Sequence, residues 1–227
     1  MAVKKRGLPA SAAPTSIAYA LEQLYVDQDH DFVVACIPAV LAWVDPGGYQ
    51  QPFVFSCEHA SMATAAVAPV ILAVSWSMPA LQAKNADVAN IANRMRTGRT
   101  PQREHVPELA AYGLALVAIS ALMPGRRVVG YMCGTAPDIL LDSTPGSLRG
   151  VEVAGRTGGG FSALRAVRDG TAAKKARRPT GGKPARKASA GLPGKAAQLL
   201  ARTDIVEVHL SLWCRGPRVA ILQSVKP

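Results

Sequence analysis

The sequence is poor in cysteine and histidine, the residues that form the disulfides of small secreted domains or bind zinc. It has only four histidines and four cysteines, namely Cys36, Cys57, Cys133 and Cys214, and the cysteines form no CxxC pair. His59 lies two residues after Cys57, but no second ligand pair follows at the spacing of a zinc site. We therefore expect buried, reduced thiols in a cytoplasmic protein rather than a disulfide framework or a zinc centre.

The sequence also lacks the features of a membrane helix or a secretion signal. The most membrane-like stretch, 60–78, contains no charged residue, but it is rich in Ala, Ser and Thr and is interrupted by Pro69. A buried helical hairpin explains this stretch as well, so we disfavour a membrane span. Residues 1–23 begin with basic residues, yet Pro9 and Pro14 break a weakly apolar middle. We expect a loose arm there, followed by a short helix over 17–25.

Acidic residues are scarce, with 15 Asp and Glu against 26 Lys and Arg, and the net charge is +11. Eight of the basic residues and no acidic one fall within 171–195, which leaves +3 for the rest of the chain. The composition of 171–191 predicts a flexible insertion that either binds nucleic-acid phosphates or serves as a solvated tether. Its basic residues are Lys174, Lys175, Arg177, Arg178, Lys183, Arg186 and Lys187.

Two short predicted strands joined by a Pro-Gly turn hold the main candidate site. Asp138 belongs to the first strand and Glu152 to the second, and alternation places both on the same sheet face if the strands pair as a hairpin. Two carboxylates a few ångströms apart favour a shared proton or a bound cation. Oxygen ligands of this kind suit Mg²⁺ or Mn²⁺. The alternative is that both side chains lie on the wet face of a half-buried sheet.

Around this hairpin the hydrophobic pattern predicts one α/β layer architecture. The expected order is a helix over about 103–123, strands over 127–133, 137–142 and 150–156, helices over 161–168 and 195–202, and strands over 205–214 and 217–225. Glu104 and Glu108 share a face near the start of the first helix, where carboxylates also suit the helix dipole.

This order, with Asp138 in a Pro-Asp pair and Glu152 on the next strand, resembles the PD-(D/E)XK nuclease superfamily and its restriction-endonuclease-like αβββαβ core. The resemblance covers about 103–227 and implies a metal-dependent nuclease that hydrolyses phosphodiester bonds, with DNA favoured and a role in defence or element mobility. It implies that Asp138 and Glu152 hold Mg²⁺ or Mn²⁺. It further implies that Glu104 or Glu108 assists them and that Gln198 contacts the substrate or the site.

The chain departs from this family at the motif lysine, because Ala154 stands two residues after the motif glutamate. A lysine there is expected to orient the attacking water and stabilise charge on the phosphate. Arg156 on the same strand face and Lys195 at the start of a later helix are the candidates to replace it. Two alternatives stay open: a catalytically inactive nucleic-acid-binding or assembly protein, and a membrane-associated protein or toxin built on 60–78.

Residues 1–100 resemble no family and are expected to form a mixed, helix-rich α/β extension of unknown role. Residues 101–227 form the expected nuclease-like domain with its basic insertion. Within the extension we predict an apolar run over 31–44, a strand over 52–56 and a helix over 87–99. The extension could bind the target or a partner, either a second copy of the chain in a homodimer or another protein.

Overall fold

One mixed sheet organises the chain. The structure is a computed structural model that describes residues 14–45, 47, 51–58, 62, 69–100, 103–132, 134–144, 146–171 and 193–227. Over these residues eight strands lie in the order β1-β3-β2-β8-β7-β6-β5-β4. The strands are β1 (Thr15–Ala20), β2 (Phe53–Glu58), β3 (Val70–Ser75), β4 (Val128–Tyr131), β5 (Ile139–Leu141), β6 (Leu148–Gly158), β7 (Ile205–Gly216) and β8 (Val219–Lys226).

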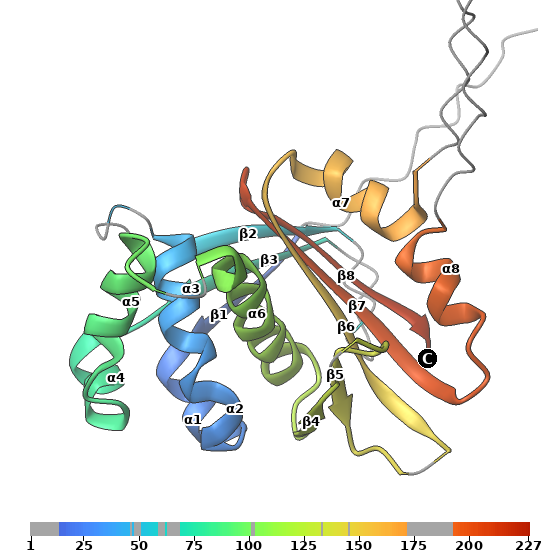
Figure 1. Cartoon of the computed structure of the whole chain (residues 1–227), viewed down its shortest axis with the longest axis horizontal. Coiled ribbons are helices and arrows are strands. Elements are labelled where there is room, and N and C mark those ends of the chain that lie inside the picture. Colours follow the sequence, from blue (N-terminus) through green and yellow to red (C-terminus); the bar gives the residue numbers. More distant parts are fainter. Residues whose placement is uncertain are drawn as a thin grey trace, which may run out of the picture.

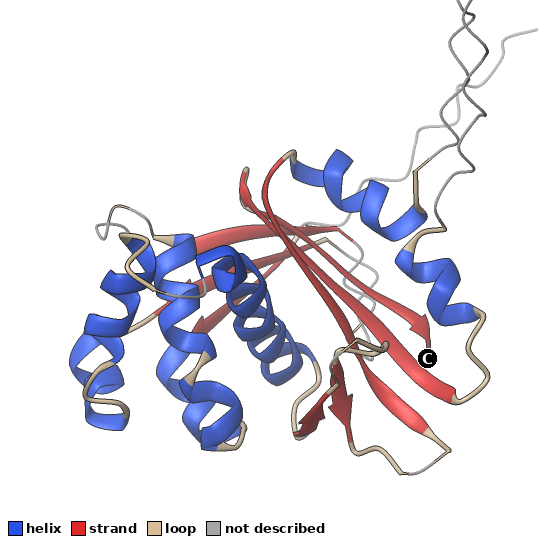
Figure 2. Cartoon of the chain, in the orientation of Figure 1, coloured by secondary structure: helices blue, strands red, loops and turns tan. Residues whose placement is uncertain are grey.

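Helices cover both faces of this sheet (Figures 1 and 2). They are α1 (Leu24–Asp27), α2 (His30–Val34), α3 (Cys36–Val44), α4 (Met78–Lys84), α5 (Val88–Arg96), α6 (Val106–Leu122), α7 (Gly160–Asp169) and α8 (Lys195–Leu200), with short 3-10 turns η1 (Leu21–Gln23) and η2 (Arg103–His105). Figure 1 shows α1 to α6 on one face and α7 and α8 on the other. Strand β7 is buried on both faces, since Trp213 packs in the first core and Leu212 in the second.

The elements expected after residue 103 are all present in the expected order, and the α/β class is confirmed. Strands β4, β5 and β6 pair antiparallel, whereas β6 and β7 pair parallel and are joined through α7 and α8. Helix α6 is buried on nearly every side between the sheet and α3, as its continuous apolar sequence predicted.

Two predictions for the N-terminal part were wrong. The helix expected over 17–25 begins instead as β1, which pairs in parallel with β3 and places Ile17 opposite Leu72. The buried helical hairpin favoured over a membrane span for 60–78 is contradicted by β3, whose residues alternate between buried and half-buried positions, while residues 60–61 and 63–68 lie outside the described part of the chain. Val70 and Val74 are β-branched and favour a strand, and the pairing partners available on either side outweigh the helix propensity of the neighbouring alanines.

No helix within the described residues has the length and apolarity needed to cross a membrane.

The N-terminal strands β1, β2 and β3 extend the same sheet that contains strands β4 to β8. Strand β2 pairs in parallel with β8, with Cys57 opposite Ala220. The larger hydrophobic core also draws on both parts of the chain, because Phe55 of β2 packs edge-on against Trp213 of β7. The division at residue 100 stays a prediction, and the two parts share a sheet and a core.

Candidate functional site

The candidate site is built at the start of the β5–β6 hairpin. The register pairs Ile139 with Val151, and one further step along both strands brings Asp138 opposite Glu152. Asp138 Oδ2 accepts a hydrogen bond from the backbone amide of Val153 at 2.7 Å, which fixes the carboxylate against β6. Gly150 permits this close pairing, because a Cβ there would lie 2.2 Å from the carbonyl oxygen of Ile139.

Lys195 reaches this carboxylate pair from the first residue of α8. Its Nζ forms a hydrogen-bonded ion pair with Glu152 Oε1 and lies 3.9 Å from Asp138 Oδ2 and 3.5 Å from the carbonyl oxygen of Val153. The preceding Gly194 packs directly on the end of α7, where a Cβ would lie 2.1 Å from the carbonyl oxygen of Arg168. Lys195 therefore lies in contact with the predicted carboxylate pair, whereas Ala154 brings no charge to it.

Glu152 is the most buried member of this group, with a side chain 7% exposed. Its Oε2 is buried and has no hydrogen-bond partner among the described residues. Burial raises the pKa of Glu152, and the nearby Asp138 adds to that rise, whereas Lys195 opposes it. Glu152 thus has an oxygen that is available to a proton or a cation.

The arrangement of oxygens favours a positive charge, and the Lys195 ammonium supplies it. Asp138, Glu152 and the carbonyl of Val153 surround the Lys195 ammonium, so a positive charge is already favoured at this point. Carboxylate and carbonyl oxygens are ligands that Mg²⁺ and Mn²⁺ accept, together with water. The unpartnered Oε2 of Glu152 provides a further lone pair.

Two other predicted residues, Arg156 and Gln198, meet Lys195 in a cavity of about 450 Å³. Gly158 of β6 and Thr171 after α7 also line it. Arg156 and Gln198 are exposed, and Gln198 Nε2 donates a hydrogen bond to the carbonyl of Pro193 at 2.8 Å. This cavity has two cationic side chains and an amide on its wall, which is the chemistry that holds phosphate groups.

The remaining predicted ligands do not join the carboxylate pair. Glu108 is 61% exposed and interacts with His105 at 3.2 Å, and Glu104 is exposed in η2. Among the described residues, no three His, Cys, Asp or Glu side chains are placed to hold one metal ion. The proposed nucleic-acid-binding residues between 174 and 187 lie outside the described part of the chain.

Sequence reasoning missed Tyr112, whose phenol on α6 interacts with Asp138. Burial raises the pKa of Tyr112, and the charges of Asp138 and Glu108 and hydrogen bonding to Asp138 raise it further. The signal that could have found it is helical spacing, because Tyr112 follows Glu104 and Glu108 at four-residue steps.

Tyr112 also lines a second cavity, of about 490 Å³, whose lining does not include Lys195. The wall of this cavity includes Asp31, Cys36, His105, Glu108 and Tyr131. Asp138 is therefore contacted by one residue from each cavity.

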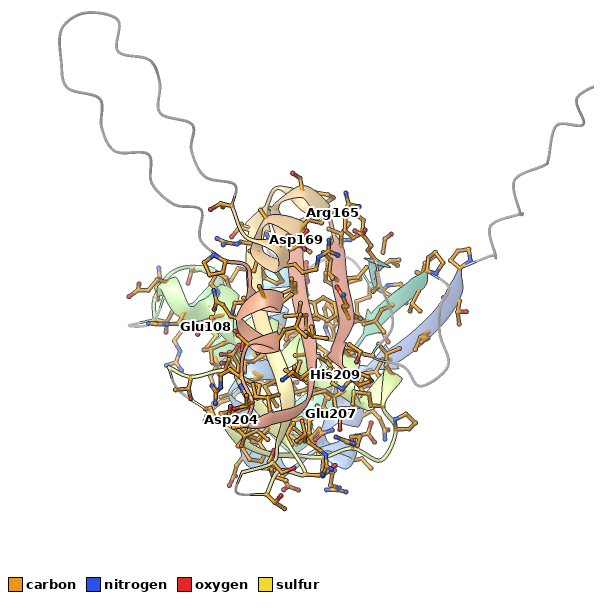
Figure 3. The ribbon with its side chains drawn as sticks, turned by 90° about the vertical axis from the view of Figure 1, so that its right-hand side faces the viewer. Glu108, Arg165, Asp169, Asp204, Glu207 and His209 are labelled. Carbon is orange, nitrogen blue, oxygen red and sulfur yellow. The ribbon has the colours of Figure 1, made fainter. Side chains whose placement is uncertain are left out.

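A separate charged cluster lies around Glu207 on β7. Arg126 donates two 3.1 Å hydrogen bonds to the Glu207 carboxylate and forms a 2.9 Å ion pair with Asp142. His209 Nε2 lies 3.0 Å from Glu207 Oε1, and Figure 3 labels Glu207 and His209. Burial acts to raise the pKa of Glu207, but the hydrogen bonds from His209 and Arg126 outweigh it and hold that pKa below its usual range. Arg149 Nε also lies 3.6 Å from Glu207 Oε2, so two arginines face two carboxylates and we assign the cluster a structural role.

No protein-family model, no curated protein and no solved structure matches the chain. A functional assignment therefore depends on the side chains that the fold brings together.

Proposed function

We propose that this protein is a metal-dependent nuclease that hydrolyses phosphodiester bonds of nucleic acid, with DNA favoured. The observation that supports this proposal is the convergence of Asp138, Glu152 and Lys195 from three separate elements. Two carboxylates and one ammonium in contact are the groups needed to hold a cation and to stabilise charge on a phosphate. The resemblance to the PD-(D/E)XK superfamily in element order agrees with this reading.

Each residue has a role that follows from its position. Asp138 and Glu152 would hold Mg²⁺ or Mn²⁺, which supplies Lewis-acid activation of a phosphoryl oxygen and a more acidic bound water. Lys195 would donate to the phosphate oxygen on which negative charge grows. Arg156 and Gln198, exposed in the same cavity as Lys195, would contact neighbouring phosphates. Arg156 contributes charge only, since a guanidinium cannot serve as a base.

The raised pKa of Glu152 couples cation binding to pH. The carboxyl must be ionised to bind a cation, so protons compete with the metal. We expect the metal concentration that gives half-maximal activity to rise as the pH is lowered through the pKa of Glu152. A titration of cleavage with Mg²⁺ at several pH values measures this dependence.

The direct test is cleavage of plasmid, linear duplex and single-stranded substrates with Mg²⁺ or Mn²⁺. Glu152→Gln and Lys195→Met should each lower the rate by about 100-fold or more, as expected for groups that stabilise transition-state charge. Glu58→Gln is a matched control, because Glu58 also pairs with a basic helix residue, Arg165, but away from the carboxylate pair. Cleavage that survives in Glu152→Gln would refute the assignment.

A non-catalytic nucleic-acid-binding protein is the second candidate. Two observations favour it: Ala154 replaces the motif lysine, and the ion pair with Lys195 partly neutralises Glu152. This candidate predicts no cleavage with either metal, together with salt-sensitive binding that Glu152→Gln leaves intact. Cleavage and binding measured on the same preparations distinguish the two functions.

A further inference from the structure

The cavity beside Tyr112 differs in chemistry from the cavity beside Lys195, whose lining suits phosphate groups. It is bounded by the side chains of Tyr112 and Tyr131 and by those of Asp31, Cys36, His105 and Glu108. Its volume of about 490 Å³ is within the usual range of small-molecule sites. Asp138 relates the two cavities, because it raises the pKa of Tyr112 in one of them and lies 3.9 Å from the ammonium of Lys195 in the other.

Three aromatic rings pack edge-on against one another beside this cavity. Phe32 packs edge-on against Tyr131 with centroids 5.1 Å apart, and Tyr131 packs edge-on against Tyr112 at 5.3 Å. The Tyr131 hydroxyl donates a 3.0 Å hydrogen bond to the carbonyl of Phe32, yet 38% of Tyr131 is exposed. A ring that is both anchored and exposed is a preorganised surface for stacking, because little side-chain entropy is lost when a flat ligand binds.

The charged groups of the cavity disfavour phosphate. Asp31 is 99% exposed and Glu108 is 61% exposed, and both carboxylates line this cavity. A phosphate would be repelled here and attracted to Arg156 and Lys195 in the other cavity. Carboxylates instead accept hydrogen bonds from the exocyclic amino groups of cytosine, adenine and guanine. Aromatic rings and carboxylates together match a nucleobase.

We propose that this cavity binds one unpaired nucleobase next to the phosphate held at Asp138, Glu152 and Lys195. This inference rests on the proposed nuclease function and specifies its substrate as single-stranded nucleic acid or a duplex with an unpaired nucleotide. A paired base has both faces stacked and its pairing edge occupied, so only a base that has left the stack can enter.

The first test measures binding without catalysis. Labelled single-stranded DNA 12-mers, with and without one central abasic site, are titrated in EDTA and followed by fluorescence anisotropy. Tyr131→Ala should weaken binding of the intact 12-mer by about tenfold, in line with the loss of one stacked base. Tyr131→Phe keeps the ring and should bind like the wild type. Val129→Ala is the matched control, since Val129 is 53% exposed on the same strand.

Two further measurements guard against a folding defect in Tyr131→Ala. Circular dichroism and urea unfolding compare its fold with that of Tyr131→Phe. Glu108→Gln alters the cavity at an exposed position, so it removes a negative charge with little risk to the core. Glu108→Gln should reduce the preference for cytosine or adenine over thymine at the unpaired position. An unchanged base preference together with tight binding by Tyr131→Ala would overturn the inference.

The second test measures cleavage of a perfect duplex and of the same duplex with one bulged nucleotide, both with Mg²⁺. We expect the bulged duplex to be cut at least tenfold faster, and Tyr131→Ala to remove most of that difference. Equal cutting of both duplexes would refute the base-binding cavity and leave the nuclease proposal intact. Tyr131-dependent binding without any cutting would refute the nuclease proposal and leave the cavity as a base-binding site.

Discussion

Replacing Lys195 by methionine removes the ammonium that contacts Glu152 and keeps an unbranched stem of similar length. In the native protein Lys195 Nζ interacts with Glu152 Oε1 and lies 3.9 Å from Asp138 Oδ2. The variant would leave Glu152, whose side chain is only 7% exposed, without its cation and next to a second carboxylate. Removing one partner of a buried ion pair costs about 3–5 kcal/mol when the other charge stays ionised.

The pH dependence of this loss has a definite sign. Burial already raises the pKa of Glu152 in the folded protein, and the loss of Lys195 removes the interaction that lowers it. A carboxyl with a raised folded-state pKa keeps its full stability below the ordinary glutamate pKa of about 4.3 and loses stability as the pH rises through the folded value. We therefore expect Lys195→Met to be close to wild type at pH 4 and to approach the full loss at pH 8.

Urea unfolding followed by tryptophan fluorescence at pH 4 and pH 8 measures this difference, with the buried Trp213 as a reporter. The midpoint at pH 8 should fall by roughly 1 M or more. Adding Glu152→Gln to Lys195→Met should restore most of the loss, since no buried charge remains. The control Arg165→Met breaks an exposed pair and should cost at most about 1 kcal/mol. Equal losses at both pH values, or no recovery in the double variant, would refute the reasoning.

Two further predictions concern stability away from the carboxylate pair. Arg126→Met removes hydrogen bonds that lower the pKa of Glu207, so about 1.5–3 kcal/mol should be lost near pH 7, and the loss should shrink as the pH falls through the lowered folded-state pKa of Glu207. Urea unfolding measured over this pH range would contradict this if the loss were constant. Gly155→Ala would place a Cβ 2.5 Å from the carbonyl oxygen of Pro107 on α6, so we expect a loss of about 1–3 kcal/mol. Gly130→Ala is the control, because its Cβ would lie 3.8 Å from Leu140 Cδ1, an ordinary van der Waals contact. An equal effect in both variants would contradict the packing argument.

The sequence predicted the second half of the fold well because each element there has a distinct hydrophobic pattern. The apolar body of α6 and the alternation in β7 distinguish helix from strand without knowledge of the neighbours. The first half was predicted less well because its strands depend on distant partners. Strand β1 is defined by parallel pairing with β3, more than fifty residues away, and no local pattern contains that information.

The candidate site shows the same contrast. The alternation that placed Asp138 and Glu152 together is local to one hairpin, and it agrees with the observed register. Lys195 is predicted as a candidate because an ammonium at the start of a neighbouring helix could reach the carboxylates in place of a lysine at position 154. Tyr112 was not predicted, since its contact with Asp138 depends on how closely α6 approaches the sheet. That approach is a property of packing and leaves only weak signals in the sequence.

Two glycines, one on each side of α6, allow the helix to pack closely against the sheet and against α3. Gly155 of β6 lets the α6 backbone at Pro107 come against the strand, and Gly113 of α6 faces α3, where an added Cβ would lie 2.5 Å from Val40 Cγ2. Tyr112 lies next to Gly113 in the helix, so α3 on one side and β6 on the other fix its position. The N-terminal part of the chain therefore shapes the proposed base-binding cavity, both by supporting α6 and by lining the cavity with Asp31 and Cys36. A nuclease-like domain without residues 1–100 would lack one wall of that cavity.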